Sequence, residues 1–574
     1  MPHPLRRVLR SLHFLFPLML LAGCASPAVH APPALSGPPG MVSAADPRAA
    51  AAGVEILNTG GSAADAAVAV MLALTVVEPQ SSGIGGGSFL VYHDEKSGRI
   101  LSYDGREAAP AAATAAYFLD DDGTARPRRD AVPGGMSVGV PGNLRLAELA
   151  HDRHGQLPWA RLFEPAIRLA REGFAITPRM HRSLAANSDL AAMTPWARSH
   201  FFDPDGQPKA VGTLLTNPDL AHFLEKMAAR GPDYFYTGPA AEALVRTVRG
   251  AARNPSSMTT GDLASYDAKE RQPLCGAYRV YRVCGMGPPS SGATTVFAIL
   301  KQLERFDLAA LGPDDPRAWH LIAESMRLAY ADREAYLGDP DFVRVPAPGL
   351  MGSSYLAGRS RLISPGRTMA KVAAGTPPGA ARVTAAADHE VPSTSHVVAA
   401  DAGGNVATLT TTIEGPWGSG LTVNGFFLNN ELTDFSFAPE ENGAPVANRV
   451  EGGKRPRSSM SPTIVYGPDG EVRIAIGAAG GITIIAQVAK ALIGVLDWNL
   501  SAQDAIALPV ILGIGDRVAV EKGTKLELMM PALAALGQQV SAIEPGFKAN
   551  AIEYVDGHWR GAADPRSEGV AISQ

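Results

Sequence analysis

Cysteine is nearly absent from this chain of 574 residues, which holds three: Cys24, Cys275 and Cys284. There is no CxxC pair, and the 13 histidines are scattered without the spacing of a zinc site. We therefore expect neither a metal nor another cofactor. Long basic runs are also missing and the formal net charge is −5, so nucleic acid is not an expected partner.

Apolar runs long enough to cross a bilayer comfortably are missing too. The run at 12–22 falls short of the about 20 apolar residues that a span requires. It follows three arginines within the first ten residues and ends in LAGC at 21–24. This pattern resembles the lipobox of bacterial lipoproteins, which implies cleavage before Cys24 and a lipid on its thiol. An ordinary cleavable signal with a chance cysteine is the alternative.

The N-terminal pattern predicts a signal peptide at 1–23 and an Ala-, Pro- and Gly-rich tether at 24–43. It also predicts export and a membrane anchor on the periplasmic side. Ala25 carries no retention signal of the aspartate type, which favours the outer membrane.

The rest of the chain is typical of a globular protein, with 46% hydrophobic and 19% charged residues. Asp46, followed by proline, predicts the start of a helix that ends at Gly60. Ser62 predicts the cap of a second helix that runs to about Val77.

A glycine run at 82–87 comes before a strand at 88–93. A phosphate loop would follow a strand and open a helix, so this run indicates a tight loop packed near a buried site. Further helices are expected over 141–230 and 316–338 and after 480–481, and further strands at 277–285, 395–413, 420–428, 462–466 and 471–477. Such an order predicts sheets between helical layers.

Cys275 and Cys284 flank a stretch that alternates like a β-hairpin. A two-residue turn at 279–280 would pair Tyr278 with Tyr281 and set the two cysteines opposite each other. An oxidising compartment permits a disulfide between them, and two free thiols are the alternative. The turn residues are not of the Asn-Gly type, which leaves the register open.

Thr394 stands where a loose segment ends and a strand begins, in VPSTSH at 391–396. A threonine hydroxyl is a poor nucleophile unless a base lies beside it. A cut between Ser393 and Thr394 would free an α-amine, whose ordinary pKa of about 7.7–8.0 suits that task. Without further evidence, an ordinary strand residue is the simpler interpretation.

A series of motifs runs in order along nearly the whole mature chain. They are DGRE at 104–107, VPG at 140–142, GPPSSG at 287–292, YLGDPDFV at 336–343, TSH at 394–396, GN at 404–405, TTTIE at 410–414, glycine at 418, LNNELTDF at 428–435, KRPRSSMSPT at 454–463, GG at 480–481 and ADPR at 563–566. Together they resemble the γ-glutamyltransferases, or glutathione hydrolases, of the N-terminal-nucleophile hydrolase superfamily.

The resemblance implies catalytic roles for four residues. Thr394 would hold the acyl group, and Thr412 would orient its hydroxyl or amine. Gly480 and Gly481 would direct backbone N–H groups at the oxyanion, where one donor is typically worth about 3–4 kcal/mol.

The resemblance also implies self-cleavage of a precursor between Ser393 and Thr394 through an N-to-O acyl shift. The products would be a large subunit, 44–393, and a small subunit, 394–574, that stay together as a heterodimer and contribute to one site.

A γ-glutamyl group carries an α-carboxylate and an α-ammonium, so its recognition needs opposite charges at fixed places. By the resemblance, Arg106 would grip the carboxylate bidentately with help from the hydroxyls of Ser458 and Ser459. The acids expected around the ammonium are Glu414, Glu431 and Asp434. Glu414 stands where many relatives have Asn, and the segment from Asp434 to Ser458 is short for a lid, which leaves acceptor preference and lid open.

The resemblance predicts an α/β (α+β) protein with the four-layer αββα sandwich of this superfamily. It implies an enzyme that cleaves glutathione or other γ-glutamyl compounds and transfers the group to water or to amino acid and dipeptide acceptors. The alternatives are a glutaryl (cephalosporin) acylase, a poly-γ-glutamate processing enzyme, or a non-catalytic surface lipoprotein. A glutaryl group lacks the ammonium, so Glu431 together with Asp434 favours γ-glutamyl substrates.

Overall fold

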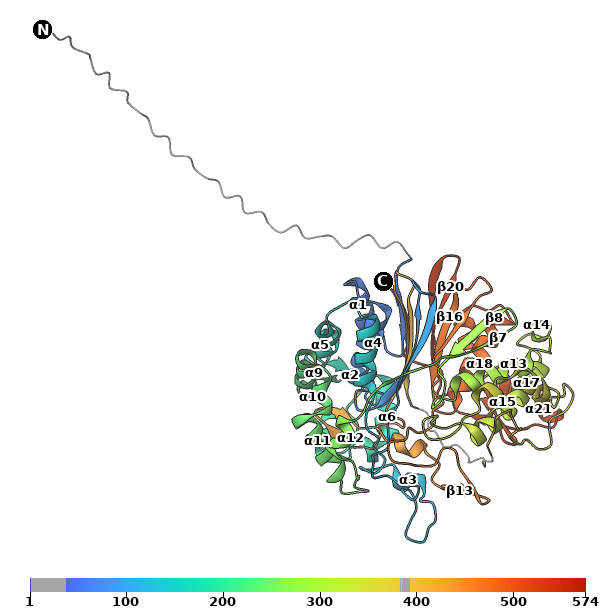
Figure 1. The fold of residues 1–574 in the computed structure, drawn as a ribbon, viewed down its shortest axis with the longest axis horizontal. Helices are drawn as coiled ribbons and strands as arrows, with labels where there is room; N and C mark the ends of the chain where they lie inside the picture. Colours follow the sequence, from blue (N-terminus) through green and yellow to red (C-terminus); the bar gives the residue numbers. More distant parts are fainter. Residues whose placement is uncertain (2–37, 382–383, 385–392) are drawn as a thin grey trace. The chain divides into compact units, whose positions relative to one another are not determined.

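The computed structural model describes residues 1, 38–381, 384 and 393–574. The expected signal peptide, Cys24 and most of the tether lie outside the described residues, as do 385–392 before the expected cut. From residue 38 onward, two β-sheets face each other and helices cover the outer face of each (Figure 1). This is the predicted αββα sandwich. Within the described ranges, no helix is both long and apolar enough to span a membrane.

The first sheet has seven antiparallel strands that come from both sides of residue 393. Their order is β22 (Val570–Ser573), β1 (Met41–Ala44), β9 (Ser395–Ala400), β10 (Val406–Thr412), β2 (Gly87–Asp94), β3 (Arg99–Gly105) and β6 (Lys269–Arg271). β9 and β10, which lie in the strand region predicted at 395–413, form a hairpin near the centre of this sheet, and Thr394 lies at one end of that hairpin.

The second sheet has six antiparallel strands, and these too come from both sides of residue 393. Their order is β21 (His558–Ala563), β20 (Lys548–Val555), β16 (Val472–Ala479), β15 (Thr463–Tyr466), β8 (Tyr281–Gly285) and β7 (Leu274–Tyr278). The β7–β8 hairpin pairs Tyr278 with Tyr281 and Cys275 with Cys284, which is the predicted register. The two cysteines form a disulfide in the structure.

Strand alternation divides the buried side chains between two cores. In β9, Val397 packs toward the first helical layer whereas Val398 packs between the sheets, and Leu90 and Phe89 of β2 divide in the same way. Because successive strand residues point to opposite faces, a sheet covered on both sides is apolar throughout.

The first helical layer begins as the sequence predicts. Asp46 caps α1 (Pro47–Asn58), and Ser62 forms a capping box with Asp65 at the start of α2 (Ala63–Val77), whose residues are all buried. α2 packs directly on β9 and β10. The other helices of this half are α3 (Arg128–Ala131), α4 (Asn143–His154), η1 (Trp159–Phe163), α5 (Glu164–Glu172), α6 (Pro178–Ala186), α7 (Ser188–Ala191), α8 (Pro195–Phe201), α9 (Pro218–Arg230), α10 (Asp233–Tyr236), α11 (Gly238–Arg249) and α12 (Thr260–Ala264).

The second helical layer covers the other sheet with α13 (Gly292–Leu303), α15 (Pro316–Tyr336) and α18 (Thr483–Leu496) (Figure 1). Helix α18 starts directly after the glycine pair that follows β16, as predicted. The remaining elements are α14 (Leu308–Leu311), α16 (Ala347–Leu350), α17 (Ser353–Ser360), α19 (Ala502–Ala507), α20 (Lys525–Leu528), α21 (Met530–Ala535), η2 (Glu431–Asp434), β4 (Phe174–Ala175), β5 (Leu214–Leu215), β11 (Thr422–Val423), β12 (Phe426–Phe427), β13 (Glu440–Glu441), β14 (Ala444–Pro445), β17 (Ile511–Ile514), β18 (Arg517–Glu521) and β19 (Gln539–Ile543).

Candidate active site

A small cavity lies where β9 begins and β10 ends. Its volume is about 10 Å³, roughly the space for one water molecule. It is lined by Arg106, Thr394, Thr412, Glu414, Glu431, Asp434, Ser458, Met460, Gly481 and Ile484. The structure thus brings together eight of the ten residues that the sequence assigns to catalysis and binding, and the other two, Gly480 and Ser459, are chain neighbours of lining residues.

The site has two sides of different chemistry. We call Thr394, Thr412, Gly480 and Gly481 the hydroxyl side. The charged side consists of Arg106, Arg128, Glu414, Glu431 and Asp434.

Thr394 is held by both its backbone and its hydroxyl. Its N–H donates to the Ser81 carbonyl (3.2 Å), and its Oγ1 lies 3.1 Å from Thr412 Oγ1. The Thr412 oxygen also accepts the Glu414 N–H at 2.8 Å, which fixes the Thr412 hydroxyl. Since the two threonines end adjacent strands, sheet register sets their separation.

The backbone at this end of the hairpin is strained. Thr394, Glu414 and Trp417 have φ values of +90°, +73° and +67°, which L-residues with side chains rarely adopt. Each such residue costs about 1–3 kcal/mol and persists because its surroundings fix it. Sequence reasoning gave no sign of this strain.

The loop after α2 contacts Thr394 and its neighbours, and the sequence predicts such a loop near a buried site. Besides Thr394, the Ser81 carbonyl accepts the Ile413 N–H (3.3 Å), and the Gln80 carbonyl accepts the Ser393 hydroxyl (3.1 Å). A Cβ on Gly86 would lie 1.9 Å from the backbone oxygen of Thr412, so only glycine allows this close approach.

A buried ion pair between Glu78 and Lys548 contacts Ser395, the residue after Thr394, and was not predicted. Glu78 Oε2 accepts the Ser395 hydroxyl at 2.6 Å and Lys548 Nζ at 2.8 Å. Burial lowers the pKa of Lys548 to about 8, and Glu78 opposes that shift. The pair ties the residue after Thr394 to α2 and to β20.

Gly480 and Gly481 adopt φ values of +133° and +55°, which suit glycine. The Gly480 carbonyl accepts the Thr483 hydroxyl at 2.7 Å, which fixes the turn before α18. Among the described residues, neither glycine N–H is bonded to an acceptor. Two adjacent donors at the cavity suit a developing oxyanion.

Arg106 follows β3 and is almost fully buried, at 1% side-chain exposure. Its Nη2 lies 2.6 Å from Asp434 Oδ2, and its Nη1 contacts Glu431 Oε1. Its Nε and Nη2 also donate to the carbonyls of Pro456 (3.1 Å) and Arg457 (2.8 Å). The two acids predicted for the ammonium therefore contact the predicted carboxylate ligand.

Arg128, at the start of α3, is a second cation in the site that the sequence did not indicate. Its Nη2 donates to Glu414 Oε1 at 2.7 Å and to Asp434 Oδ1 at 3.3 Å, and its Nη1 donates to the Thr433 carbonyl. The other Glu414 oxygen accepts the Asn430 side-chain amide. Arg128 comes from a segment without helical or strand periodicity, so no sequence signal marked it.

Two acids beside Arg106 titrate at unusually high pH. Burial raises the pKa of Glu107 to about 7 and that of Glu431 well above its usual range. Arg106, whose Nη1 lies 3.9 Å from Glu107 Oε2, opposes both shifts without cancelling them. Burial therefore favours the protonated form of both carboxyls.

The two predicted serines are placed differently. Ser458 lines the cavity, and its Oγ accepts the Met460 N–H at 3.1 Å. Ser459 is fully buried, and its Oγ accepts Arg333 Nη2 at 2.7 Å.

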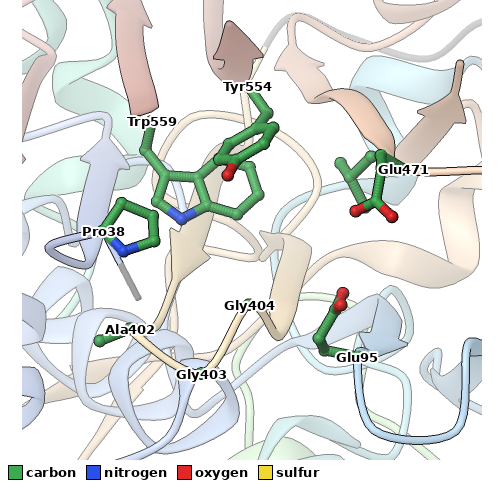
Figure 2. Close-up of a pocket in the computed structure, with 9 residues that line it drawn as sticks. Pro38, Glu95, Ala402, Gly403, Gly404, Glu471, Tyr554 and Trp559 are labelled. Carbon is green, nitrogen blue, oxygen red and sulfur yellow. The ribbon is translucent and has the colours of Figure 1, made fainter. Parts of the chain in front are cut away.

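A larger cavity of about 220 Å³ lies at the opposite, turn end of β9 and β10 (Figure 2). Glu95 and Glu471 face it together with the rings of Tyr554 and Trp559. Its lining residues include no threonine, serine or arginine. The smaller cavity, which has a paired hydroxyl and an arginine, is therefore the candidate active site.

Known proteins resemble this chain over nearly its full length. Residues 49–574 match the sequence profile of the family described as Gamma-glutamyltranspeptidase. The chain is 37% identical over 552 residues to a glutathione hydrolase proenzyme of Bacillus subtilis (strain 168), covering 93% of this chain and 92% of that protein. It is 34% identical over 548 residues to the acylase ACY 1 proenzyme of Pseudomonas sp. (strain SE83), covering 94% of each. A crystal structure of a cephalosporin acylase from Bacillus halodurans aligns with a TM-score of 0.82 and 25% identity, over 96% of this chain and 99% of that one. This chain belongs to the γ-glutamyltranspeptidase family.

Proposed function

We propose that this protein is a self-processed γ-glutamyltransferase and glutathione hydrolase with Thr394 as its nucleophile. One observation carries the proposal: the Thr394 hydroxyl, the Gly481 backbone and the Arg106 guanidinium border one cavity. Family membership and the glutathione hydrolase proenzyme of B. subtilis support it.

The acyl transfer has two steps. The Thr394 Oγ attacks the γ-carbonyl carbon while its proton passes to the α-amine of Thr394, and the N–H groups of Gly480 and Gly481 stabilise the oxyanion. The C–N bond then breaks, and the leaving amine, such as cysteinylglycine from glutathione, takes the proton. Water or an amino acid or dipeptide amine attacks the ester and frees Thr394.

Processing uses the same hydroxyl. Thr394 Oγ attacks the carbonyl carbon of Ser393, the peptide C–N bond breaks, and the nitrogen takes a proton to become the α-amine. Water then hydrolyses the ester and leaves a carboxylate on Ser393. The strained φ of Thr394 favours this step because cleavage releases the strain.

The cut would give a large subunit, 44–393, and a small subunit, 394–574, as a lasting heterodimer. Both β-sheets contain strands from each side of the cut, so separating the subunits would break both sheets. A lipid on Cys24, after removal of 1–23, would anchor the enzyme through the tether 24–43 on the periplasmic side of the outer membrane.

A glutaryl acylase is the second candidate. The contacts of Arg128 favour it, since this cation already lies on two acids that an α-ammonium would need. The acylase relatives are consistent with such a function.

Two measurements on purified protein test the proposal. A denaturing gel should show two bands whose N-terminal sequences place the cut before Thr394. Initial rates with γ-glutamyl and glutaryl p-nitroanilides should then favour the γ-glutamyl compound. An uncut chain, or hydrolysis of the glutaryl anilide alone, would contradict the assignment.

A further inference from the structure

Arg128 occupies a place in the charged side that a substrate cation would otherwise take. One guanidinium nitrogen bridges Glu414 Oε1 (2.7 Å) and Asp434 Oδ1 (3.3 Å). An α-ammonium has three N–H donors in a compact head, and it would seek the same two carboxylate oxygens.

The remaining oxygens of these two acids are engaged as well. Glu414 Oε2 accepts the Asn430 amide, and Asp434 Oδ2 accepts Arg106 Nη2 at 2.6 Å. The carboxylate oxygens that an ammonium would need on these two acids are thus already bonded. An ammonium-bearing acyl group must therefore displace the Arg128 head or lose its charge partners.

The two arginines differ in how firmly they are held. Arg106 is 1% exposed and also donates to two backbone carbonyls, those of Pro456 and Arg457. Arg128 is 19% exposed, donates to one backbone carbonyl, that of Thr433, and begins the four-residue helix α3. Its long side chain reaches solvent and can swing out with the loss of one carbonyl contact, whereas Arg106 would leave two carbonyls without that donor.

We propose that Arg128 sets the acyl-group specificity of this enzyme by standing in the α-ammonium position. An acyl group with an ammonium must expel it, whereas one without, such as glutaryl, binds with Arg128 in place. This inference rests on the proposed function, because it concerns the acyl group that Thr394 receives.

The displacement has a measurable cost. If Arg128 lies inward most of the time, only the fraction of molecules with Arg128 outward binds an ammonium, and the apparent affinity falls by that fraction. For a glutaryl group, an inward Arg128 should raise the apparent affinity instead of lowering it. Its anionic carboxylate benefits from a nearby cation that balances Glu414 and Asp434.

The test is Arg128→Gln, assayed with γ-glutamyl p-nitroanilide and glutaryl p-nitroanilide. We expect KM for the γ-glutamyl compound to fall about tenfold and KM for the glutaryl compound to rise about threefold, with kcat changing less than about twofold. General damage to the site would weaken both substrates. A shift of both KM values in the same direction, or no shift, overturns the inference.

Arg129→Gln is the matched control. Its side chain is 87% exposed, and the nearest acid is its neighbour Asp130 at 3.8 Å. This variant should leave both KM values unchanged. If Arg128→Gln fails to process, Arg128→Lys keeps a cation with a shorter reach, and it should shift the KM ratio in the same direction by a smaller factor.

Product inhibition gives a readout that does not depend on the leaving group. L-Glutamate carries the ammonium and glutarate does not. Arg128→Gln should strengthen inhibition by L-glutamate and weaken inhibition by glutarate, and equal changes count against the inference. If the wild type were inactive on the γ-glutamyl substrate, the proposed function would be wrong. Activity on that substrate gained in Arg128→Gln would still support the role of Arg128.

Discussion

The hydroxyl side and the charged side of the cavity are built by different means. Thr394 and Thr412 end adjacent strands, and Gly480 follows a strand of the facing sheet, so secondary structure fixes their geometry. The charged side comes from loops and short helices that ion pairs hold together. We infer that substitutions on the hydroxyl side change the chemical step, whereas those on the charged side change which acyl group binds.

The largest effect is expected at Thr394. Thr394→Ala removes the proposed nucleophile of both processing and transfer, so the chain should stay uncut and kcat/KM should fall by about 10⁴-fold or more. Gel electrophoresis and anilide hydrolysis check both outcomes. Thr394→Ser is the control that keeps a hydroxyl, and it should still be cut. A processed Thr394→Ala chain would contradict the assignment of the hydroxyl side.

Arg106 should give the next largest effect, mainly on binding. Arg106→Met removes the proposed ligand of the substrate carboxylate, so KM for γ-glutamyl anilide should rise about 100-fold with a smaller change in kcat. It also leaves Glu431 and Asp434 buried without that cation, which should cost about 3–5 kcal/mol of unfolding free energy.

The KM and kcat of Arg106→Met separate recognition from chemistry, and thermal unfolding gives the stability cost. Arg106→Lys keeps the charge but loses the bidentate guanidinium. Its KM and its stability should lie between those of Arg106→Met and those of the wild type. Unchanged KM in Arg106→Met would remove the distinction between the two sides.

Thr412 should have a smaller effect, on kcat alone. Thr412→Val keeps the shape but removes the hydroxyl that lies 3.1 Å from Thr394 Oγ1. The nucleophile then loses its orienting partner, and kcat should fall about 10- to 100-fold. Thr410→Val is the control. Thr410 is not among the residues that line the cavity, and its Oγ1 lies 2.9 Å from His396 Nδ1. Equal losses in both variants would assign Thr412 to stability.

Local pattern predicted many of the strands and helices, whereas the motif resemblance supplied the residues of the hydroxyl side and the four-layer fold. Alternation located β9 and β10, and the cap at Ser62 located α2. The motif resemblance supplied Arg106 and the acids but not their arrangement, in which Arg106 contacts both Glu431 and Asp434.

What the sequence did not reveal depends on contacts between distant segments. Arg128 and Glu414 are 286 residues apart, and Glu78 and Lys548 are 470 apart. Neither pair leaves a periodic or motif signal, because only the folded chain brings the charges together. The positive φ of Thr394 is likewise set by its neighbours in space.

The smallest expected effect is the pH dependence that Glu107 adds to the charged side. Burial raises its pKa from an ordinary 4.5 to about 7. The folded state then holds the proton more tightly than the unfolded state does. The stability that Glu107 contributes is therefore fully present below about pH 4.5 and is lost as pH rises through about 7, a difference of at most about 3 kcal/mol.

Glu107→Gln removes this titration and keeps the shape. The unfolding free energy of the wild type, relative to the variant, should fall between pH 4.5 and 8, as measured by denaturant unfolding at several pH values. Glu172→Gln, at an exposed site, should run parallel to the wild type. A parallel curve for Glu107→Gln as well would mean that Glu107 titrates as an ordinary carboxyl and adds no pH dependence to the charged side.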